Sequence, residues 1–515
     1  MTLIRRLSSG TKALLAAALV AGAAIAAPAA AHAAPANINP DTDRSLTLTK
    51  MSAPTESGYT GTEGEALTEI PTGSIPLSGV TLQIQQVTEY GGQEVNLLRA
   101  EGWDRISALL KSDLEFDPAA AGTTLAPGSS KETGAEGTAV WTSSELPIGL
   151  YWVTETDLGE HHIAQPVKPF LISVPTPVND EPGVWNYHPH AYPKNTVVTA
   201  EKTVDESNAE AIGDGLRWTI TGTIPTNPST GVTIDRYQVV DTLPEGLEWA
   251  EEAASAAVTF HSLHDEESEE LTAEDFTLDF EEDARMLTMT LGEAALAKVQ
   301  DAIGKRGGHV AFSFTTRVLD LGAGGVFDNE ANVLINQAEV PTGATSYFGP
   351  LEIRKIADGD VNRPLADGHF QVFASREVAE AANEAVKNGQ TPEGAVDVLV
   401  AGEQVTTFVT EDTGSVLVPG LKTIADGLAY WVVETRAPAG YIRADAVYEV
   451  TVKPEQEPTG AAILTVSNPQ QPPLTLVVTG AAEHPALKAA GALLLLAGIG
   501  AGIASIARKR VSTSK

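Results

Sequence analysis

Cysteine is absent from this chain of 515 residues. A chain without thiols cannot build a disulfide framework, a cysteine-ligated metal site or a cysteine nucleophile. Basic residues are also scarce, because 33 Lys and Arg stand against 68 Asp and Glu and leave a net charge of −35. Such an acidic surface repels phosphate groups, so we expect no nucleic-acid partner.

The usual sequence signatures of catalysis are missing as well. The chain has no hydrolase nucleophile elbow, no phosphate-binding glycine loop and no HExxH zinc motif. Histidines cluster in "HH" (161–162) and "HPH" (188–190), without cysteine or a spaced set of carboxylates. Two histidine pairs on separate loops do not predict a metal centre. We therefore expect a protein that is not an enzyme and has no cofactor and no metal.

Both ends of the chain carry targeting patterns. Residues 1–33 combine a basic start, an apolar centre and a small-residue end, which is typical of a secretory signal peptide cleaved after Ala33. Residues 489–507 form an uncharged apolar run followed by "RKR". Such a run of ~19 residues can just span a bilayer, and the basic cluster would stay in the cytoplasm. We expect an exported protein whose tail is at first held in the membrane.

The body of the chain alternates apolar and polar residues in many short runs. Examples are "RSLTLTK" (44–50), "LRWTITGTIP" (216–225), "VAFSFTTRV" (310–318) and "YWVVET" (430–435). This alternation predicts half-buried strands, and 46 Gly and 31 Pro supply the turns between them. Short helices are predicted at 102–113, 293–304 and 376–389. The pattern indicates an all-β protein of β-sandwich domains, with length for three or four of them.

The first and third parts of the body repeat one pattern. "SLTLTK", "GVTLQIQQV" and "GLYWVTET" of the first part match "LEIRKIAD", "GHFQVFA" and "LAYWVVETRAP" of the third. Two copies of one module therefore flank a different one. Between the first part and the middle part, "WNYHPHAYPKN" (185–195) contains two prolines and predicts a stiff, extended connector that presents Lys194.

Some polar residues fall on strand faces that should be buried. Lys355 follows Leu351 and Ile353 at alternate positions, so its side chain should share their inner face. Glu434 and Asn468 occupy inward positions in "YWVVET" and "LTVSN". The middle part offers a second such set, namely Lys202, Asp241 and Asn329.

Groups of these three types would react with one another if they met in a core. Burial lowers the pKa of a lysine and raises the pKa of a carboxyl group. A neutral amine can then attack the amide carbon of asparagine while a protonated carboxyl group polarises the amide carbonyl. The product is a Lys–Asn isopeptide bond, and ammonia is lost. The alternatives are three buried polar groups that only hydrogen-bond with one another, or polar residues at an exposed strand end.

Three motifs resemble those of the shaft pilins of Gram-positive bacteria, the backbone subunits that class C sortases polymerise. "WNYHPHAYPK" is similar to the pilin motif, W-x3-V-x-V-Y-P-K. It departs from that motif at Pro189 and Ala191, where valines are usual. The matching residues are Trp185, Tyr192, Pro193 and Lys194.

The other two motifs lie near the end of the chain. "YWVVETRAPAGY" (430–441) resembles the E-box, Y-x-L-x-E-T-x-A-P-x-G-Y, with Val432 in place of leucine. "LVVTG", followed by the apolar run and "RKR", resembles an LPxTG sorting signal in which Val477 replaces the proline. The residues of this signal are Leu476, Val477, Val478, Thr479 and Gly480.

The resemblance implies three immunoglobulin-like domains. They would be an N-terminal pilin domain (34–194), a middle domain of the CNA-A type (195–345) and a third domain of the CNA-B type (346–470). The signal peptide (1–33) precedes them, and the sorting signal (471–480) and the membrane segment with its basic tail (481–515) follow.

The resemblance also implies roles for individual residues. Lys202 would bond to Asn329 with the assistance of Asp241, and Lys355 would bond to Asn468 with the assistance of Glu434. The first domain is not expected to form such a bond, because its strand "FLISVPTP" has no asparagine, and this leaves Glu155 without a function. Lys194 would join the subunit to Thr479 of its neighbour.

The implied function is that of a structural shaft subunit in a covalent, adhesive pilus anchored to the cell wall. Its partners would be neighbouring copies of itself, a class C sortase, a housekeeping sortase, minor tip and base pilins, and peptidoglycan. Two alternatives share much of this pattern. One is a wall-anchored adhesin that does not polymerise, which would not need "YPK", and the other is a base or tip pilin.

Overall fold

The computed structural model describes residues 37–54, 64–111, 116–178, 181, 183–225, 232–250, 256–264, 267–454 and 460–472. Strands dominate these residues, which confirms the predicted all-β class, and the three predicted helices are present. They are α1 (Ala100–Lys111), α2 (Glu293–Ile303) and α3 (Arg376–Lys387). None of the helices in the described part of the chain is long and apolar enough to span a bilayer. The predicted signal peptide and membrane segment lie outside the described residues.

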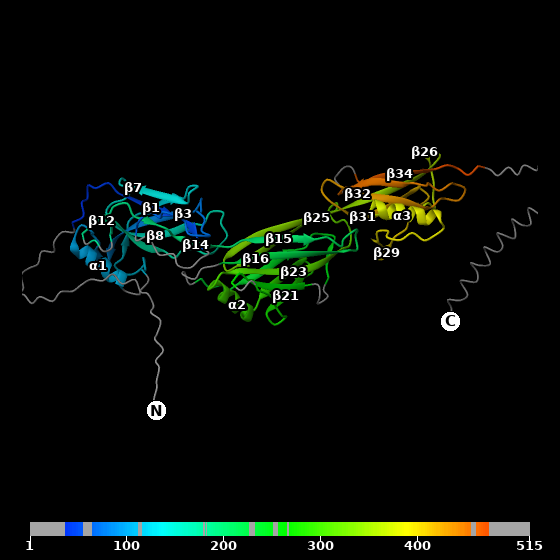
Figure 1. Ribbon diagram of the computed structural model, residues 1–515. Helices are drawn as coiled ribbons and strands as arrows, with labels where there is room; N and C mark the ends of the chain where they lie inside the picture. The colour runs from blue at the N-terminus through cyan, green and yellow to red at the C-terminus, as the bar shows by residue number, and fades with distance from the viewer. Residues whose placement is uncertain are drawn as a thin grey trace, which may run out of the picture.

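The strands gather into three blocks that follow one another in a row (Figure 1). The N-terminal block forms sheets in the orders β13-β1-β7, β10-β8-β3-β4, β2-β14-β9 and β11-β12. Its core packs alternate residues of β3, such as Leu82 and Ile84, around the fully buried Trp141 of β7. The strands are β1 (Ser45–Thr49), β2 (Met51–Ser52), β3 (Thr81–Tyr90), β4 (Gln93–Glu94), β5 (Thr124–Leu125), β6 (Ser129–Glu132), β7 (Thr138–Thr142), β8 (Gly149–Asp157), β9 (Ile163–Gln165), β10 (Phe170–Val174), β11 (Thr176–Pro177), β12 (Trp185–Asn186), β13 (His190–Ala191) and β14 (Lys194–Val197).

The middle block is a sandwich of two sheets. One sheet has the order β15-β16-β23-β19-β20, and the other has the order β21-β22-β17-β24-β25. Trp218 and Phe312 of the first sheet and Val333 of the second are fully buried in one apolar core. The strands are β15 (Ala200–Asp205), β16 (Gly215–Ile224), β17 (Tyr237–Thr242), β18 (Leu247–Trp249), β19 (Ala256–Ser262), β20 (Glu267–Glu270), β21 (Phe276–Glu281), β22 (Met286–Leu291), β23 (Gly308–Val318), β24 (Val326–Ile335) and β25 (Ala338–Ala357).

The C-terminal block shares β25 with the middle block. The later part of β25 pairs with β31 and, in parallel, with β34, and the facing sheet has the order β30-β27-β32-β33. Helix α3 contributes Ala379 and Ala382 to a small cluster with Phe373 and Val433. The remaining strands are β26 (Asp360–Pro364), β27 (His369–Phe373), β28 (Val398–Val400), β29 (Glu403–Val405), β30 (Phe408–Val409), β31 (Ser415–Thr423), β32 (Leu428–Arg436), β33 (Val447–Val452) and β34 (Ala462–Asn468).

The two junctions between blocks differ. Besides the continuous β25, the middle and C-terminal blocks exchange backbone hydrogen bonds, from Ile212 N to Gly420 O (3.1 Å) and from Leu399 N to Ile212 O (2.9 Å). The N-terminal block meets the middle block at residues 198–199. There, Val198 N donates to His162 O (2.9 Å) and Asn336 Nδ2 donates to Ala164 O (3.4 Å). No strand of the described residues runs through this second junction.

Residues 185–195, predicted as a stiff, extended connector, are extended but are paired into the sheets of the N-terminal block. β12 pairs with β11, β13 pairs with β1, and β14 pairs with β2 and β9. Proline lacks an N–H donor, yet its carbonyl still accepts hydrogen bonds. Pro189 O accepts from Thr47 N (3.0 Å), and Pro193 O accepts from Met51 N (3.1 Å). Both prolines therefore take part in the pairing as acceptors, and the segment stays attached to the sheets.

Gly349 lies where β25 passes between the two blocks, at an irregularity in its pairing with β31. A Cβ at this position would lie 2.0 Å from Lys453 O, whereas a Cβ at Gly343 on the same strand would meet its nearest atom at 3.5 Å. We expect Gly349→Ala to lower the free energy of unfolding by about 1–3 kcal/mol, because backbone must shift. Gly343→Ala is the matched control and should have little effect. Thermal denaturation of both variants checks this, and equal melting temperatures would contradict it.

Candidate functional site

The middle block brings Lys202, Asp241 and Asn329 into its core, as the alternation of the strands predicts. Lys202 on β15 donates a hydrogen bond to Asp241 on β17, and both side chains have no solvent-exposed surface. Burial lowers the pKa of Lys202 to about 8, against the opposing effect of Asp241. Burial also raises the pKa of Asp241, against the opposing effect of Lys202. The lysine is thus more easily deprotonated than an ordinary lysine, and the acid is more easily protonated than an ordinary aspartate.

Asn329 is the third member of this set, and its side-chain amide lacks hydrogen bonds to the described residues. The residue is fully buried on β24 and close enough to Asp241 to affect the pKa of that carboxyl group. Nevertheless, neither amide atom has a hydrogen-bond partner among the described residues. A buried polar group without a partner costs about 1–3 kcal/mol. The reaction expected from the sequence, attack of the lysine amine on this amide carbon, would give a physical reason for tolerating that cost.

The C-terminal block contains an equivalent arrangement of Lys355, Glu434 and Asn468, all fully buried. The Lys355 amine lies 3.5 Å from Glu434 Oε1, and Asn468 Nδ2 donates to the same carboxylate oxygen at 2.7 Å. The second oxygen of Glu434 accepts a hydrogen bond from Ala444 N at 2.7 Å. Burial lowers the pKa of Lys355, against the opposing effect of Glu434. Both predicted sets of three residues are therefore brought together.

The N-terminal block contains a third set that the sequence analysis missed. Lys50 is fully buried, and its Nζ donates to Asn195 Oδ1 at 2.5 Å and lies 3.1 Å from Glu155 Oε1. Asn195 Nδ2 donates to that same oxygen of Glu155 at 2.8 Å, and Val167 N donates to Asn195 Oδ1 at 2.7 Å. Burial lowers the pKa of Lys50 to about 8. Glu155, which the sequence left without a function, connects the lysine to the asparagine.

The reason for the omission is topological. The last strand of the first part that is clear from the sequence is β10, and β10 contains no asparagine. The strand that corresponds to β34 is instead β14, since each pairs in parallel with the strand at the lysine: Lys194 with Met51, and Val466 with Lys355. Part of this signal was available. The echo of "SLTLTK" and "LEIRK" already aligns Lys50 with Lys355, and Asn195 directly follows the motif lysine.

The three sets can support the same reaction. The lysine Nζ attacks the side-chain carbonyl carbon of asparagine, the C–Nδ2 bond breaks, and ammonia leaves. The carboxyl group lies between the amine and Nδ2 in the two outer blocks, so it can carry the proton from the attacking nitrogen to the leaving one. In the N-terminal set, the Val167 N–H also stabilises negative charge that develops on the carbonyl oxygen.

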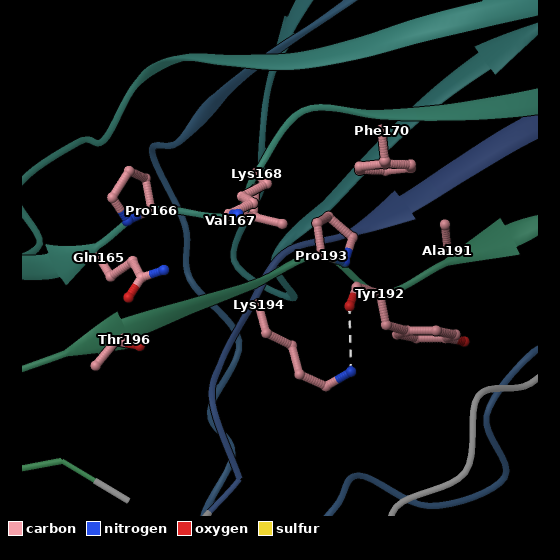
Figure 2. A pocket seen from close by; sticks show the side chains of 10 residues that line it. All are labelled: Gln165, Pro166, Val167, Lys168, Phe170, Ala191, Tyr192, Pro193, Lys194 and Thr196. Carbon is pink, nitrogen blue, oxygen red and sulfur yellow. Dashed lines mark hydrogen bonds between the residues drawn. The ribbon is translucent and has the colours of Figure 1, made fainter. Parts of the chain in front are cut away.

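Lys194 lies on β14 at the side of the N-terminal block that faces the middle block (Figure 1). It is half-buried in a pocket of about 440 Å³, which we call the Lys194 pocket. Its amine folds back to donate to Tyr192 O at 3.2 Å (Figure 2). Burial lowers the pKa of Lys194. The walls of the pocket are Gln165, Pro166, Val167, Lys168, Phe170, Ala191, Tyr192, Pro193, Lys194 and Thr196.

The other residues of the motif hold this strand in place. The Trp185 ring packs 4.8 Å from that of Trp103, and its Nε1 donates to Asn37 Oδ1 at 2.8 Å. The Tyr192 hydroxyl accepts a hydrogen bond from Leu67 N at 2.7 Å. His188 of "HPH" bonds to Ser45 Oγ at 2.9 Å. The sorting-signal residues Leu476 to Gly480, including Thr479, lie outside the described residues.

Two family models match the chain. Residues 41–196 match the N-terminal domain D1 of Gram-positive pilin subunits, and residues 349–466 match the SpaA prealbumin-like fold domain. The first match extends to residue 196, and so includes both Lys194 and Asn195.

Relatives and solved structures agree with these matches. The fimbrial subunit type 1 of Actinomyces viscosus is 27% identical, over 97% of this chain and 98% of that protein. The fimbrial subunit type 2 of Actinomyces naeslundii is 27% identical, over 84% of each chain. The fold is similar to that of the full-length major pilin SpaD from Corynebacterium diphtheriae, with a TM-score of 0.60 and 24% identity over 85% of this chain and 99% of that one. The first and last blocks thus match domains of Gram-positive pilins, and the relatives that align along the length of the chain are fimbrial subunits.

Proposed function

We propose that the protein is the repeating shaft subunit of a covalent pilus on the cell surface. In this proposal Lys194 of one subunit is joined to Thr479 of the next. A sortase cleaves between Thr479 and Gly480 and holds the Thr479 carbonyl as a thioester. The Lys194 amine attacks that carbonyl, an amide bond forms, and the sortase thiol leaves with the proton of the amine.

The position of Lys194 carries this proposal. Its amine lies in a pocket with largely apolar walls, and burial lowers its pKa, so a larger share is neutral and nucleophilic than for an ordinary surface lysine. Lys194 belongs to the N-terminal block and Thr479 follows the C-terminal block in the sequence, so a linkage between two copies does not close on itself and the fibre grows linearly. A wall-anchored adhesin that does not polymerise would need no such lysine.

The remaining assignments follow the same proposal. The blocks are an N-terminal pilin domain, a CNA-A-like middle domain and a CNA-B-like domain ending near residue 470. We place the end of the first domain at the end of β14, Val197, rather than at the predicted residue 194. Each carries one Lys–Asn isopeptide bond: Lys50–Asn195, Lys202–Asn329 and Lys355–Asn468. A class C sortase polymerises the subunits with minor tip and base pilins, and a housekeeping sortase attaches the fibre to peptidoglycan. Residues 471–480 act as the sorting signal, and residues 481–515 hold the precursor in the membrane.

The internal bonds can be counted by intact mass. We expect the purified, folded chain to be lighter than its sequence by three molecules of ammonia. Glu155→Gln, Asp241→Asn and Glu434→Gln should each restore one ammonia, because an amide cannot carry the proton from the amine to the leaving group. Glu145→Gln, which removes an exposed ion pair with Lys131, is the control and should restore none. A wild-type mass equal to that of the sequence would refute the internal bonds.

Loss of the middle bond should lower stability. The bond would close a loop of more than 100 residues between Lys202 and Asn329. Closing such a loop restricts the unfolded chain as a disulfide does, which is worth roughly 4–5 kcal/mol. We therefore expect Asp241→Asn to unfold at a clearly lower temperature or denaturant concentration than the wild type. A midpoint within error of that of Glu145→Gln would contradict the expectation.

The linkage itself is tested by substitution of Lys194 in cells that assemble the fibre. Wild-type cells should give a ladder of polymers that survives boiling in detergent, because amide bonds do not melt. Lys194→Ala should give single subunits that retain their internal bonds. Lys194→Arg should fail as well, since a guanidinium stays protonated and cannot attack a thioester. Persistence of the ladder in Lys194→Ala cells would assign the linkage to another lysine, and absence of a ladder in the wild type would favour the adhesin.

A further inference from the structure

Strand β34 of the C-terminal block has an unpaired edge. It pairs in parallel with β25, and no other strand among the described residues pairs with it. In the N-terminal block the segment that ends in β14 takes the same position, and there the edge is covered. Pro189 O accepts from Thr47 N on one side of that segment, while His190 N donates to Gly64 O at 2.9 Å on the other side. The two related blocks therefore differ at this edge.

The sequence of β34 leaves this edge unprotected. Exposed strand edges usually carry charges or proline, which prevent pairing with another chain. β34 reads AILTVSN and has neither. By contrast, the edge strand β20 of the middle block reads ESEE. β31, at the opposite edge of the sheet of β34, contains Pro419 and is bonded to the middle block from Ile212 N to Gly420 O (3.1 Å).

The outer face of the sheet beside this edge is apolar. Leu417 of β31, Glu352 of β25 and Ile463 of β34 lie in one row across the sheet. Leu417 is 54% exposed and Ile463 is 51% exposed. Arg354 neutralises Glu352 between them through two hydrogen bonds, of 2.9 and 2.7 Å. An exposed apolar side chain beside an unpaired backbone edge is a surface that an added strand would cover.

The charge of the chain favours a second copy of β34 as the added strand. With a net charge of −35, two copies repel each other over most of their surfaces and approach best where neither carries charge. A half-turn about an axis normal to the sheet at Leu464 makes the two strands antiparallel and keeps both outer faces on the same side. In this register Ile463 of each copy lies opposite Thr465 of the other.

We infer that β34 is a self-association edge, through which two copies of the chain pair antiparallel and join their C-terminal sheets into one. This pairing goes beyond the proposed linkage and does not depend on it. One strand of seven residues covers less surface than the ~1,200–2,000 Å² of a stable interface, so we expect single chains to pair weakly.

The direction of β34 suits contact between fibres. β34 lies parallel to β25, which passes from the middle block into the C-terminal block along the row of blocks (Figure 1). The unpaired edge therefore lies on the flank of the molecule rather than at either end of the row. In the proposed fibre this edge repeats once per subunit, and many weak pairings between two fibres add up to a strong one.

The absence of native cysteine allows a site-specific test with full-length chains. Ile463→Cys and Thr465→Cys each place one thiol at an exposed position of β34. Leu417→Cys, at a similarly exposed position on the opposite edge of the sheet, is the matched control. The chains are mixed in pairs under mild oxidation, and the disulfide-linked peptides are identified by mass spectrometry. A melting temperature equal to that of the wild type shows that each variant is folded.

We expect the mixed disulfide between Ile463→Cys and Thr465→Cys chains to form about tenfold or more faster than any disulfide of Leu417→Cys, because pairing raises the effective concentration of the two thiols. Directly opposite residues have Cα atoms about 4.5–5.5 Å apart, which a disulfide can bridge. Disulfides between two identical chains should form slowly, since those positions are about 8 Å apart in this register.

A charge at the edge gives an independent check in the cysteine-free chain. Thr465→Lys places an ammonium group within the pairing, and should lower the association constant in sedimentation equilibrium about tenfold or more. Leu417→Lys makes the same change in net charge on the same face of the sheet, and should leave the association constant unchanged.

Three results would overturn the inference. The first is a mixed disulfide that forms no faster than those of Leu417→Cys. The second is a disulfide between identical Ile463→Cys or Thr465→Cys chains that forms as fast as the mixed one, since this excludes the antiparallel register. The third is an equal loss of association in Thr465→Lys and Leu417→Lys, which would assign the contact to the apolar face. Neither experiment needs a sortase or Lys194, so these failures leave the proposed linkage to its own test, the polymer ladder.

Discussion

A lysine amine buried in a β-sandwich core is the constraint on which each block depends. Removing a charged amine from water costs several kcal/mol unless a partner compensates it. Each block supplies a carboxyl group within 3.5 Å of the amine and an asparagine beside it. The lysine lies in an early strand of its block, or directly between two such strands in the case of Lys50, and the asparagine lies in a late strand. A covalent bond between them would therefore link the early and late strands of the block and prevent them from separating.

Strand alternation was enough to find two of the three sets. Whether Lys355 or Lys202 faces inward depends only on its neighbours along one strand, so the parity of the pattern is a local property. Helices 376–387 and 293–303 were equally visible because their apolar periodicity and starting points are local too. The β-sandwich class followed from the density of such strands.

Asn195 could not be found in this way, because its role is set by long-range pairing. β14 pairs with β2, and the paired residues Met51 and Lys194 are 143 residues apart in the sequence. At this pairing the Pro193 carbonyl accepts a hydrogen bond from Met51 N. Two prolines in one segment locally predict a connector. Proline keeps its carbonyl acceptor, however, and through this acceptor the segment pairs with a distant strand. For the same reason the sequence did not predict the structural role of the other motif residues. Trp185 and Tyr192 hold in place the strand that carries Lys194.

The continuous strand β25 has a mechanical consequence. If subunits are joined as proposed, tension on a fibre would enter a subunit at Lys194, pass along the backbone to Lys202, and cross to Asn329 through the proposed bond. It would then follow β25 to Lys355 and cross to Asn468 through the second proposed bond, toward the end of the chain. β25 is already extended over its 20 residues, so this route contains little slack. The sandwich that precedes Lys194 hangs beside the route, attached at Asn195, and could unfold under load without lengthening the fibre.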